Sequence, residues 1–443
     1  MTMASTFLLI GLMWIVFRAY LFSARRLNIF DIPNFRSSHE QITVRGAGIL
    51  LPLAWIGFSL ANGFFLPYFT TGLFLIALIS FLDDIRSRTI AIRVGVHFAA
   101  IALAIFELYS DISLPWYTIP LMAVVFFTTI NIVNFMDGIN GMLGIQGLVF
   151  LLSLMVYKSR QADLDFMLGF QSPFPFLFAA LAVFGYYNFR KKALVFSGDV
   201  GSISTAFIMV FVIACTVLGI SLVTPSTVPN SITGEFVFNG FDLRYLLLLG
   251  VFYVDAGVTI VHRMILGEKI TSSHRKHLYQ FLVNEMKWPH LVVSSIYGIV
   301  QLGLSLLVVL YQPGNDATVV IGGLLLALYV TIRMRVIQEI ARREIVRTVP
   351  ETTNAELKTQ DTPIRKTNVA LAGGSAPLLP LDSVYNQQKV ELHAMDSIQE
   401  DVQEQEPVEQ ADVRRKTFGK LSSSTSLHSN RLPYRKEDFN SQS

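Results

Sequence analysis

Charged residues are scarce in this sequence, and cysteine is almost absent. Asp, Glu, Lys and Arg make up 15% of the 443 residues, whereas about 25% is usual for a soluble domain. Hydrophobic residues make up 52% of the chain, and the mean hydropathy is +0.50. This composition excludes an ordinary soluble globular protein. The sequence has one cysteine, Cys215, which lies in an apolar run, so an intrachain disulfide is excluded.

Apolar runs of about 15–22 residues recur up to about residue 336, and each is long enough to cross a bilayer as a helix. We therefore predict an all-α fold, a polytopic transmembrane helical bundle of about eleven spans. The predicted spans are residues 5–24, 45–62, 67–82, 90–108, 115–133, 140–157, 173–189, 203–223, 243–261, 291–311 and 317–335. The first run lacks the small-residue cleavage site of a signal peptide, so we interpret it as a retained span.

Basic residues gather in alternate loops between these spans. These loops contain Arg25, Arg26, Arg36, Arg45, Arg86, Arg88, Arg93, Arg190, Lys191, Lys192, Arg263, Lys269, Arg275, Lys276, Lys287, Arg333, Arg335, Arg342 and Arg343. The intervening loops hold only Lys158, Arg160 and Arg244. Because cytoplasmic loops carry the excess of Lys and Arg, we predict the N-terminus outside and the C-terminus in the cytoplasm.

The chain changes character after about residue 347. Residues 348–443 are rich in Gln, Glu, Ser, Thr and charge, and they contain few apolar clusters. Such a composition cannot bury enough apolar surface to form a core. We predict a membrane domain over residues 1–347 and a largely disordered cytoplasmic tail over 348–443.

A polar stretch separates two apolar runs near the middle of the chain. Asn131, Asn134, Asp137 and Asn140 recur there at every third residue, and helical neighbours three apart share a face. Lipid offers such side chains no hydrogen-bonding partners. Ionisable groups in or beside a membrane span are therefore functional candidates, although a solvated loop with helix caps is the alternative.

Two adjacent carboxylates, Asp83 and Asp84, end the third predicted span. They repel each other and are unfavourable at the C-terminal end of a helix dipole. One interpretation is a pair that anchors magnesium or accepts a proton. The other is a solvated helix end that pairs with Arg86 and Arg88.

Two further stretches on the basic side carry candidate ligands. Gly198–Ser202 predicts a tight turn with free backbone N–H groups, in which Asp199 is either a metal ligand or a cap of the next helix. The most basic loop holds Arg263, His274 and His277, a set that suits a diphosphate. Ordinary positive-inside charge is the alternative, and it accounts poorly for the histidines.

The first basic loop has a similar content. Pro33 shapes the loop, and Arg36, His39 and Arg45 are further potential anion ligands. A solvated, positively charged loop is the alternative. Taken together, the polar stretches combine carboxylates and amides with Arg, Lys and His on one predicted side. This combination suits Mg²⁺ and a diphosphate at a membrane surface.

Five motifs occur in one order between about residues 25 and 335. They are Asp31-x-Pro33-x-x-Arg36-x-x-His39, Asp83-Asp84, Asn131-x-x-Asn134-Phe-Met-Asp137-Gly-Ile-Asn140-Gly-Met, Gly198-Asp199-Val-Gly-Ser and His274-Arg-Lys-His277. In this order they resemble the polyprenyl-phosphate N-acetylhexosamine-1-phosphate transferase family, of the glycosyltransferase family 4 type. Position 140 is Asn where many members have Asp. The last motif is most similar to the O-antigen-initiating branch and less similar to phospho-N-acetylmuramoyl-pentapeptide transferase.

The resemblance implies a reaction at the cytoplasmic side of a bacterial inner membrane. Undecaprenyl phosphate and a UDP-N-acetylhexosamine would give undecaprenyl-diphospho-sugar and UMP, with Mg²⁺, or Mn²⁺ in its place, as cofactor. Membrane lipid is an expected partner and nucleic acid is not. The oligomeric state stays open, a homodimer included, as does the choice among GlcNAc, GalNAc, FucNAc and QuiNAc donors.

The resemblance also implies roles for individual residues. The expected catalytic residues are Asp83, Asp84, Asp137 and Asp199, of which Asp199 and Asp137 are the expected metal ligands. The expected substrate-binding residues are Asn131, Asn134, Asn140, Arg36, His39, Arg263, His274 and His277. The rival class is an anion transporter, which predicts charges near mid-membrane and often internal repeats. The charges here cluster at one predicted surface, and no repeat is apparent.

Overall fold

A computed structural model describes residues 3–33, 41–110, 114–160, 170–220, 222, 242–269 and 275–348. All of them belong to the first of two units into which the chain divides, Met1–Ala355 and Glu356–Ser443. The predicted tail, apart from Thr348, lies outside the described residues. So do three predicted site residues: Arg36, His39 and His274.

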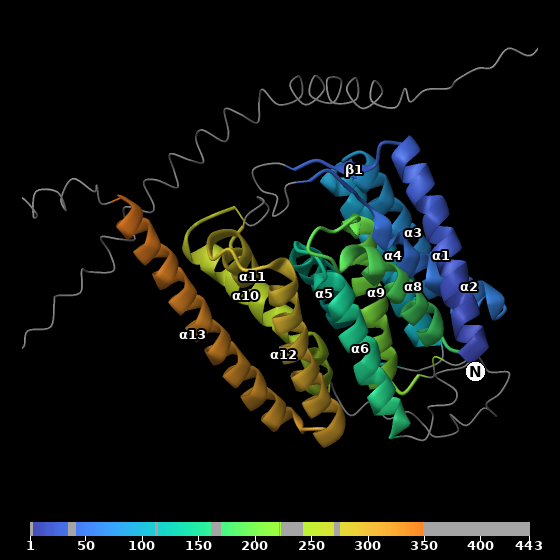
Figure 1. The fold of residues 1–443 in the computed structure, drawn as a ribbon. Helices are drawn as coiled ribbons and strands as arrows, with labels where there is room; N and C mark the ends of the chain where they lie inside the picture. Colours follow the sequence, from blue (N-terminus) through green and yellow to red (C-terminus); the bar gives the residue numbers. More distant parts are fainter. Residues whose placement is uncertain are drawn as a thin grey trace, which may run out of the picture. The chain divides into compact units, whose positions relative to one another are not determined.

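The described part of the chain is mostly helical (Figure 1). Its longer helices are α1 (Met3–Arg26), α2 (Leu50–Ala61), α3 (Pro67–Ile85), α4 (Ile90–Ser110), α5 (Thr118–Met136), α6 (Met142–Ser159), α8 (Phe174–Asn188), α9 (Gly198–Val217), α10 (Gly250–Ile265), α12 (His290–Tyr311) and α13 (Asn315–Thr348). Short helical segments are η1 (Ala47–Ile49), η3 (Leu243–Leu249), α11 (Leu278–Gln280) and the π-helical η4 (Phe281–Glu285).

Within these ranges, nine helices are long and apolar enough to cross a membrane. Two shorter apolar segments, Ala47–Ala61 and Phe174–Asn188, occupy the places of the second and seventh predicted spans. A helical protein with many apolar helices that could span a membrane is therefore confirmed. The number of spans and their orientation stay predictions.

A short hairpin departs from the predicted all-α fold. Strand β1 (Phe30–Asp31) pairs antiparallel with β2 (Thr43–Val44), and Val44 also bridges Val195. The backbone N–H of Ala47 then donates to the Phe196 carbonyl at 2.9 Å. These bonds hold the chain after β2 against the segment before α9. Two-residue strands are too short for a periodic pattern to reveal.

Helix α9 is the most enclosed of the candidate spans, with 83% of its apolar window buried. It contacts α2, α3, α5 and α6, and Figure 1 shows it among these helices. Residues 206–215 are apolar on every side, as expected for a helix surrounded by others. The rings of Phe69 and Phe211 stack with centroids 3.7 Å apart, which locks α3 against α9.

Candidate active site

The N-terminus of α9 is capped by a carboxylate from another helix. Asp84, in the last turn of α3, accepts hydrogen bonds from the backbone N–H groups of Asp199 at 2.9 Å and Val200 at 3.0 Å. The first N–H groups of a helix have no partner within the helix and attract negative charge. A capping role therefore accounts for the burial of Asp84.

This arrangement requires glycine at position 198. Gly198 has φ +71°, a left-handed conformation that side chains disfavour. A Cβ atom there would lie 2.4 Å from the Asp84 carboxylate and 2.7 Å from the Gly46 nitrogen. The sequence predicted a turn over Gly198–Ser202 and a span from residue 203. The turn instead ends at Gly198, and the helix begins there, because Asp84 supplies the cap.

Alternating ion pairs connect α3, α4, α9 and the chain after β2. Arg93 in α4 contacts Asp83 at 3.0 Å and Asp199 at 3.2 Å. Arg45 contacts Asp84 at 2.7 Å and Asp199 at 3.3 Å. Asp199 thus lies between two guanidinium groups. The sequence left open that Asp83 and Asp84 pair with Arg86 and Arg88. Their ion pairs are with Arg93 and Arg45 instead, and Arg88 donates its backbone N–H to Asp83.

The electrostatics of this network retain an excess of negative charge. Three carboxylates share two guanidinium groups. Burial opposes the charge on Arg45, but Asp84, Asp199 and Asp31 together raise the pKa of its guanidinium above the ordinary value. Arg45 is therefore a permanent cation that holds two acidic side chains in place.

Asp137 lies directly after α5 and has a different environment. Its carboxylate accepts a short hydrogen bond from the Ser197 hydroxyl. Burial, together with the negative charges of Asp199 and Asp84, raises the pKa of Asp137 to about 7, and the Ser197 hydroxyl only partly opposes this. Asp137 forms no ion pair with the described residues, so a bound cation would stabilise its ionised form.

Amide side chains fix the loops around Asp137. Asn134 accepts a hydrogen bond from the Ser202 hydroxyl at 2.6 Å, which joins α5 to α9. Asn188, the last residue of α8, accepts from the Gly141 N–H at 2.8 Å and donates to the Val195 carbonyl at 2.9 Å. Asn140 donates to the carbonyl of Arg190 at 3.1 Å. The turn between α5 and α6 is thereby tied to the segment that leads into α9.

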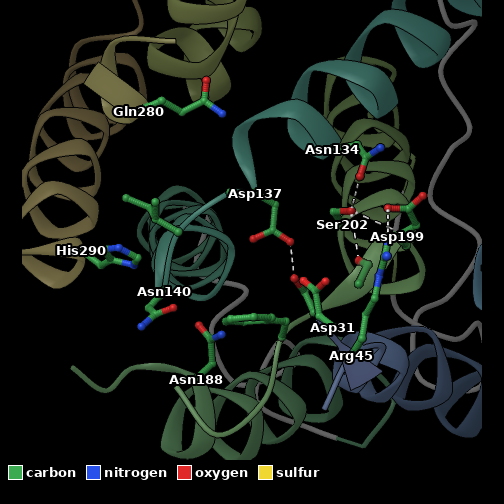
Figure 2. Close-up of a pocket in the computed structure, with 15 residues that line it drawn as sticks. Asp31, Arg45, Asn134, Asp137, Asn140, Asn188, Asp199, Ser202, Gln280 and His290 are labelled. Atoms are coloured by element: carbon green, nitrogen blue, oxygen red, sulfur yellow. Dashed lines mark hydrogen bonds and ion pairs between the residues drawn. The ribbon is translucent and has the colours of Figure 1, made fainter. Parts of the chain in front are cut away.

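These groups surround a polar cavity of about 260 Å³. Its lining residues are Asp31, Arg45, Asn134, Asp137, Gly138, Ile139, Asn140, Asn188, Phe196, Ser197, Gly198, Asp199, Ser202, Gln280 and His290. Figure 2 shows Asp199 and Arg45 on one side, and Gln280 and His290 across the cavity from them. One wall is therefore charged, and the opposite wall carries an amide and an imidazole.

The cavity brings together four of the predicted site residues: Asn134, Asp137, Asn140 and Asp199. The other predicted residues that the structure describes do not line it. Asp83 and Asp84 lie behind Asp199 in the ion-pair network. Asn131 donates to the Phe127 carbonyl of its own helix at 2.7 Å.

The two predicted residues from the last loop are also outside the lining. Arg263 is 1% exposed and pairs with Glu268 at 3.0 Å. His277 is buried with its Nδ1 2.9 Å from Asp255. The predicted diphosphate-binding roles of these two residues stay predictions.

Sequence reasoning missed several residues that build the site. Arg93 was counted only as positive-inside charge, and Asn188, Ser197 and His290 were not singled out. Arg93 follows the Asp83–Asp84 pair closely in the sequence, and this short separation was a signal that they could pair. Asn188 was a polar residue at the end of an otherwise apolar span. Neither signal identifies the distant partner, which is Asp199 for Arg93 and Gly141 for Asn188.

The carboxylates that line the cavity could bind Mg²⁺ or Mn²⁺ with only one or two protein ligands. In the described ranges, no group of three or more His, Cys, Asp or Glu side chains is arranged to hold a metal ion. Mg²⁺, however, usually binds one or two carboxylates and takes its other ligands from water and substrate phosphates. Asp137 has the hard oxygen ligands and the raised pKa that such an ion would relieve. Asp199 is held by two arginines, which leave part of its carboxylate facing the cavity as a second candidate ligand.

Comparison with known proteins matches part of the chain to a family model. The model of glycosyl transferase family 4 matches residues 66–217, which run from the start of α3 to the end of α9. No curated protein matches the chain. The matched segment contains Asp84, Asn134, Asp137 and Asp199, and it supports a glycosyl transferase of this family at the level of that segment.

Proposed function

We propose that the protein is a phospho-sugar transferase. The segment that matches the transferase family contains Asp137 and Asp199, which line the cavity. The protein would transfer an N-acetylhexosamine-1-phosphate from a UDP-N-acetylhexosamine to undecaprenyl phosphate, giving undecaprenyl-diphospho-sugar and UMP. The proposed location is the cytoplasmic side of the bacterial inner membrane. The proposed role is the first membrane step of O-antigen or other cell-surface polysaccharide synthesis.

The observation that carries this proposal is the placement of Asp137 and Asp199. One follows the end of an apolar helix and the other begins one, and both line the same polar cavity. A lipid phosphate at a membrane surface and a soluble nucleotide diphosphate would have to meet at such a place. The transporter alternative expects the binding site near mid-membrane instead.

In the proposed reaction, an oxygen of the lipid phosphate attacks the β-phosphorus of the UDP-sugar. The bond between that phosphorus and the oxygen bridging to the α-phosphorus breaks, and UMP leaves with the bridging oxygen and its electron pair. A phosphate monoester has a second pKa of about 6, so the nucleophile is largely ionised at neutral pH. A strong general base is therefore not required.

The chain's own residues would bind and orient these groups. Asp137 and Asp199 would hold Mg²⁺ or Mn²⁺, which when bound would neutralise the diphosphate. Arg45 would supply a fixed positive charge at the cavity wall, where charge develops in the transition state. Asp83 and Asp84 would act as positioning residues, because they hold Arg93 and Arg45 on Asp199.

The test is UMP release by the purified full-length protein, with undecaprenyl phosphate, Mg²⁺ and a panel of UDP-N-acetylhexosamines. We expect release with at least one donor, and loss of release when either the lipid phosphate or Mg²⁺ is omitted. Glu339→Gln is a matched control, since it removes a carboxylate from an exposed pair with Arg343 on α13. Release without the lipid acceptor would indicate a hydrolase. Movement of a UDP-sugar into liposomes without any UMP release would favour the transporter.

A further inference from the structure

A second buried carboxylate lies in α10, outside the cavity. Asp255 is fully buried and lies 2.9 Å from His277 Nδ1. It also accepts hydrogen bonds from the Tyr297 hydroxyl at 2.6 Å and the Thr259 hydroxyl at 3.4 Å. A buried carboxylate is costly unless it is paired and hydrogen-bonded. The structure satisfies both of its oxygens, with groups from α10, α12 and the segment before α11.

A buried cation completes this cluster from α13. Arg333 is 3% exposed and donates to the Thr259 hydroxyl at 3.0 Å and to the Tyr329 hydroxyl at 3.2 Å. Thr259 in turn contacts Asp255. Asp255, His277, Tyr297, Thr259 and Arg333 are called the Asp255 cluster below. The cluster joins three helices to the residue that begins α11.

The segment after His277 reaches the cavity in two ways. The His277 N–H donates to the side-chain oxygen of Gln280 at 3.2 Å, and Gln280 lines the cavity. The Tyr279 hydroxyl donates to the Phe135 carbonyl at 2.9 Å, in the last turn of α5. The rings of His277 and Tyr279 also stack, with centroids 5.7 Å apart.

Tyr279 also sets the turn that carries Asp137. A Cβ atom at Gly138 would lie 2.2 Å from the Tyr279 hydroxyl oxygen, so only glycine allows this approach. Tyr279 is buried and covers the backbone immediately after Asp137. Tyr279 therefore packs directly against the Asp137 turn, in addition to the amide side chains that hold it.

We infer that Asp255 is a positioning residue for the cavity, which acts through His277. By holding His277, it places Tyr279 against the Asp137 turn and Gln280 in the cavity wall. Loss of the Asp255 charge would loosen α11 and the turn at 137–140 together, although Asp255 contacts neither Asp137 nor the cavity. The consequence for transfer rests on the proposed function, whereas the structural coupling does not.

The test is backbone hydrogen–deuterium exchange in the purified full-length protein, which needs no substrate. Asp255→Asn keeps the shape of the side chain but removes its charge. We expect exchange to rise about tenfold or more in peptides that cover 278–281 and 137–142, because hydrogen bonds to a buried charge are lost. His277→Gln, which leaves Asp255 with Tyr297, should raise exchange in the same two segments and serves if Asp255→Asn does not fold.

Gln301→Leu is the matched control. Gln301 is a fully buried amide of α12 that accepts from the Val251 N–H at 3.0 Å and donates to the Leu247 carbonyl at 2.9 Å. It joins α12 to α10 and η3, and none of its hydrogen bonds is to α11. Its replacement should leave exchange at 278–281 and 137–142 within about twofold. The inference would be overturned if Gln301→Leu raised exchange in both segments as much as Asp255→Asn does. It would also be overturned if Asp255→Asn left their exchange unchanged.

The transfer assay gives a second readout. Asp255→Asn should raise the KM for whichever UDP-N-acetylhexosamine is used, and this increase should shrink at least threefold in a Gln280→Ala background, where the wall residue is already lost. Equal increases in both backgrounds would show that Asp255 does not act through Gln280. If no donor releases UMP while the exchange result holds, the proposed function fails and the positioning role stands.

Discussion

Two clusters of buried carboxylates differ in how their charge is balanced. At the N-terminus of α9, Asp83, Asp84 and Asp199 share two guanidinium groups, and Asp137 lies nearby and accepts a hydrogen bond from a serine hydroxyl. In α10, Asp255 stands alone among a histidine, a tyrosine and a threonine, with Arg333 one hydrogen bond away. The first cluster carries an excess of negative charge, and the second does not.

This difference separates a binding site from a structural one. Excess negative charge beside a polar cavity favours a cation or a proton, and the raised pKa of Asp137 expresses that demand. The Asp255 cluster is enclosed and its hydrogen bonds are satisfied, so it needs no ligand. It instead holds α10, α12, α13 and the start of α11 together. We therefore expect ligands to change the stability of the first cluster, and changes in the second cluster to alter the position of the first.

The largest expected effect follows from removing the charge of Asp199. Asp199→Asn would leave Arg45 and Arg93 without the carboxylate that lies between them. A metal ion that stabilises transition-state charge contributes several kcal/mol, which is about 100-fold or more in rate. We expect kcat/KM for UMP release to fall by about that factor at saturating Mg²⁺, with Glu339→Gln unchanged. Near-full activity would refute the role of Asp199 as a metal ligand.

Asp84 should matter mainly for stability. Asp84→Asn retains the shape of the cap but weakens two N–H bonds and the pair with Arg45. Hydrogen bonds to a charged group contribute about 1.5–3 kcal/mol, and a loss of this order is expected in the free energy of unfolding. Thermal unfolding in detergent measures it. A Tm shift no larger than that of Glu339→Gln would argue against the cap.

The pKa of Asp137 predicts a pH dependence of stability in the metal-free protein. The unfolded chain releases this proton near 3.8, whereas the folded chain keeps it up to about pH 7. The folded state thus binds more protons between these values, so stability falls as pH rises from about 4 to about 7 and then levels off. We expect Tm to be higher at pH 6 than at pH 8, and Asp137→Asn to reduce the difference.

Magnesium should reverse part of this trend. A cation binds the ionised carboxylate, so added Mg²⁺ should raise Tm more at pH 8 than at pH 6. The measurement is the same melting experiment with and without Mg²⁺. Equal stabilisation by Mg²⁺ at both pH values, or in Asp137→Asn as in the unmodified chain, would contradict Asp137 as a ligand.

The smallest expected effect belongs to the second cluster. Tyr297→Phe removes one hydrogen bond to Asp255 and leaves its contact with His277. One hydrogen bond to a charged group contributes about 1.5–3 kcal/mol, and because the other bonds of Asp255 remain, we expect a loss near the lower end of this range in unfolding free energy. The kcat should change less than twofold. A large fall in kcat with unchanged stability would place the second cluster in the chemistry itself and remove the distinction between the clusters.

Much of the fold was predictable because its signals are local in sequence. Each predicted span overlaps an apolar helical segment, since a run long enough to cross a bilayer is a property of consecutive residues. Asn134, Asp137 and Asp199 were predicted from polar residues at the ends of such runs, and all three line the cavity. The β1–β2 pairing was not predictable, because two-residue strands are too short to show a period-2 pattern.

The remaining parts of the site depend on distant residues. Arg45 and Arg93 lie 154 and 106 positions from Asp199, so no window of sequence contains the pairs. Asp255 was an isolated acid within an apolar run and was not singled out. His277 was predicted to bind substrate, and this stays a prediction; its contact with Asp255, 22 positions away, was not predicted.

The sequence by itself determined that this chain is helical, that its apolar segments are long enough for a membrane, and that carboxylates and amides occur where those segments end. Hydrophobic length and the cost of burying polar groups decide these features locally. Only the tertiary structure decided which carboxylates line a cavity, which cap a helix, and which hold a loop. That division depends on the partners that helix packing brings to each carboxylate: two arginines for Asp199, the N-terminus of α9 for Asp84, and a histidine for Asp255.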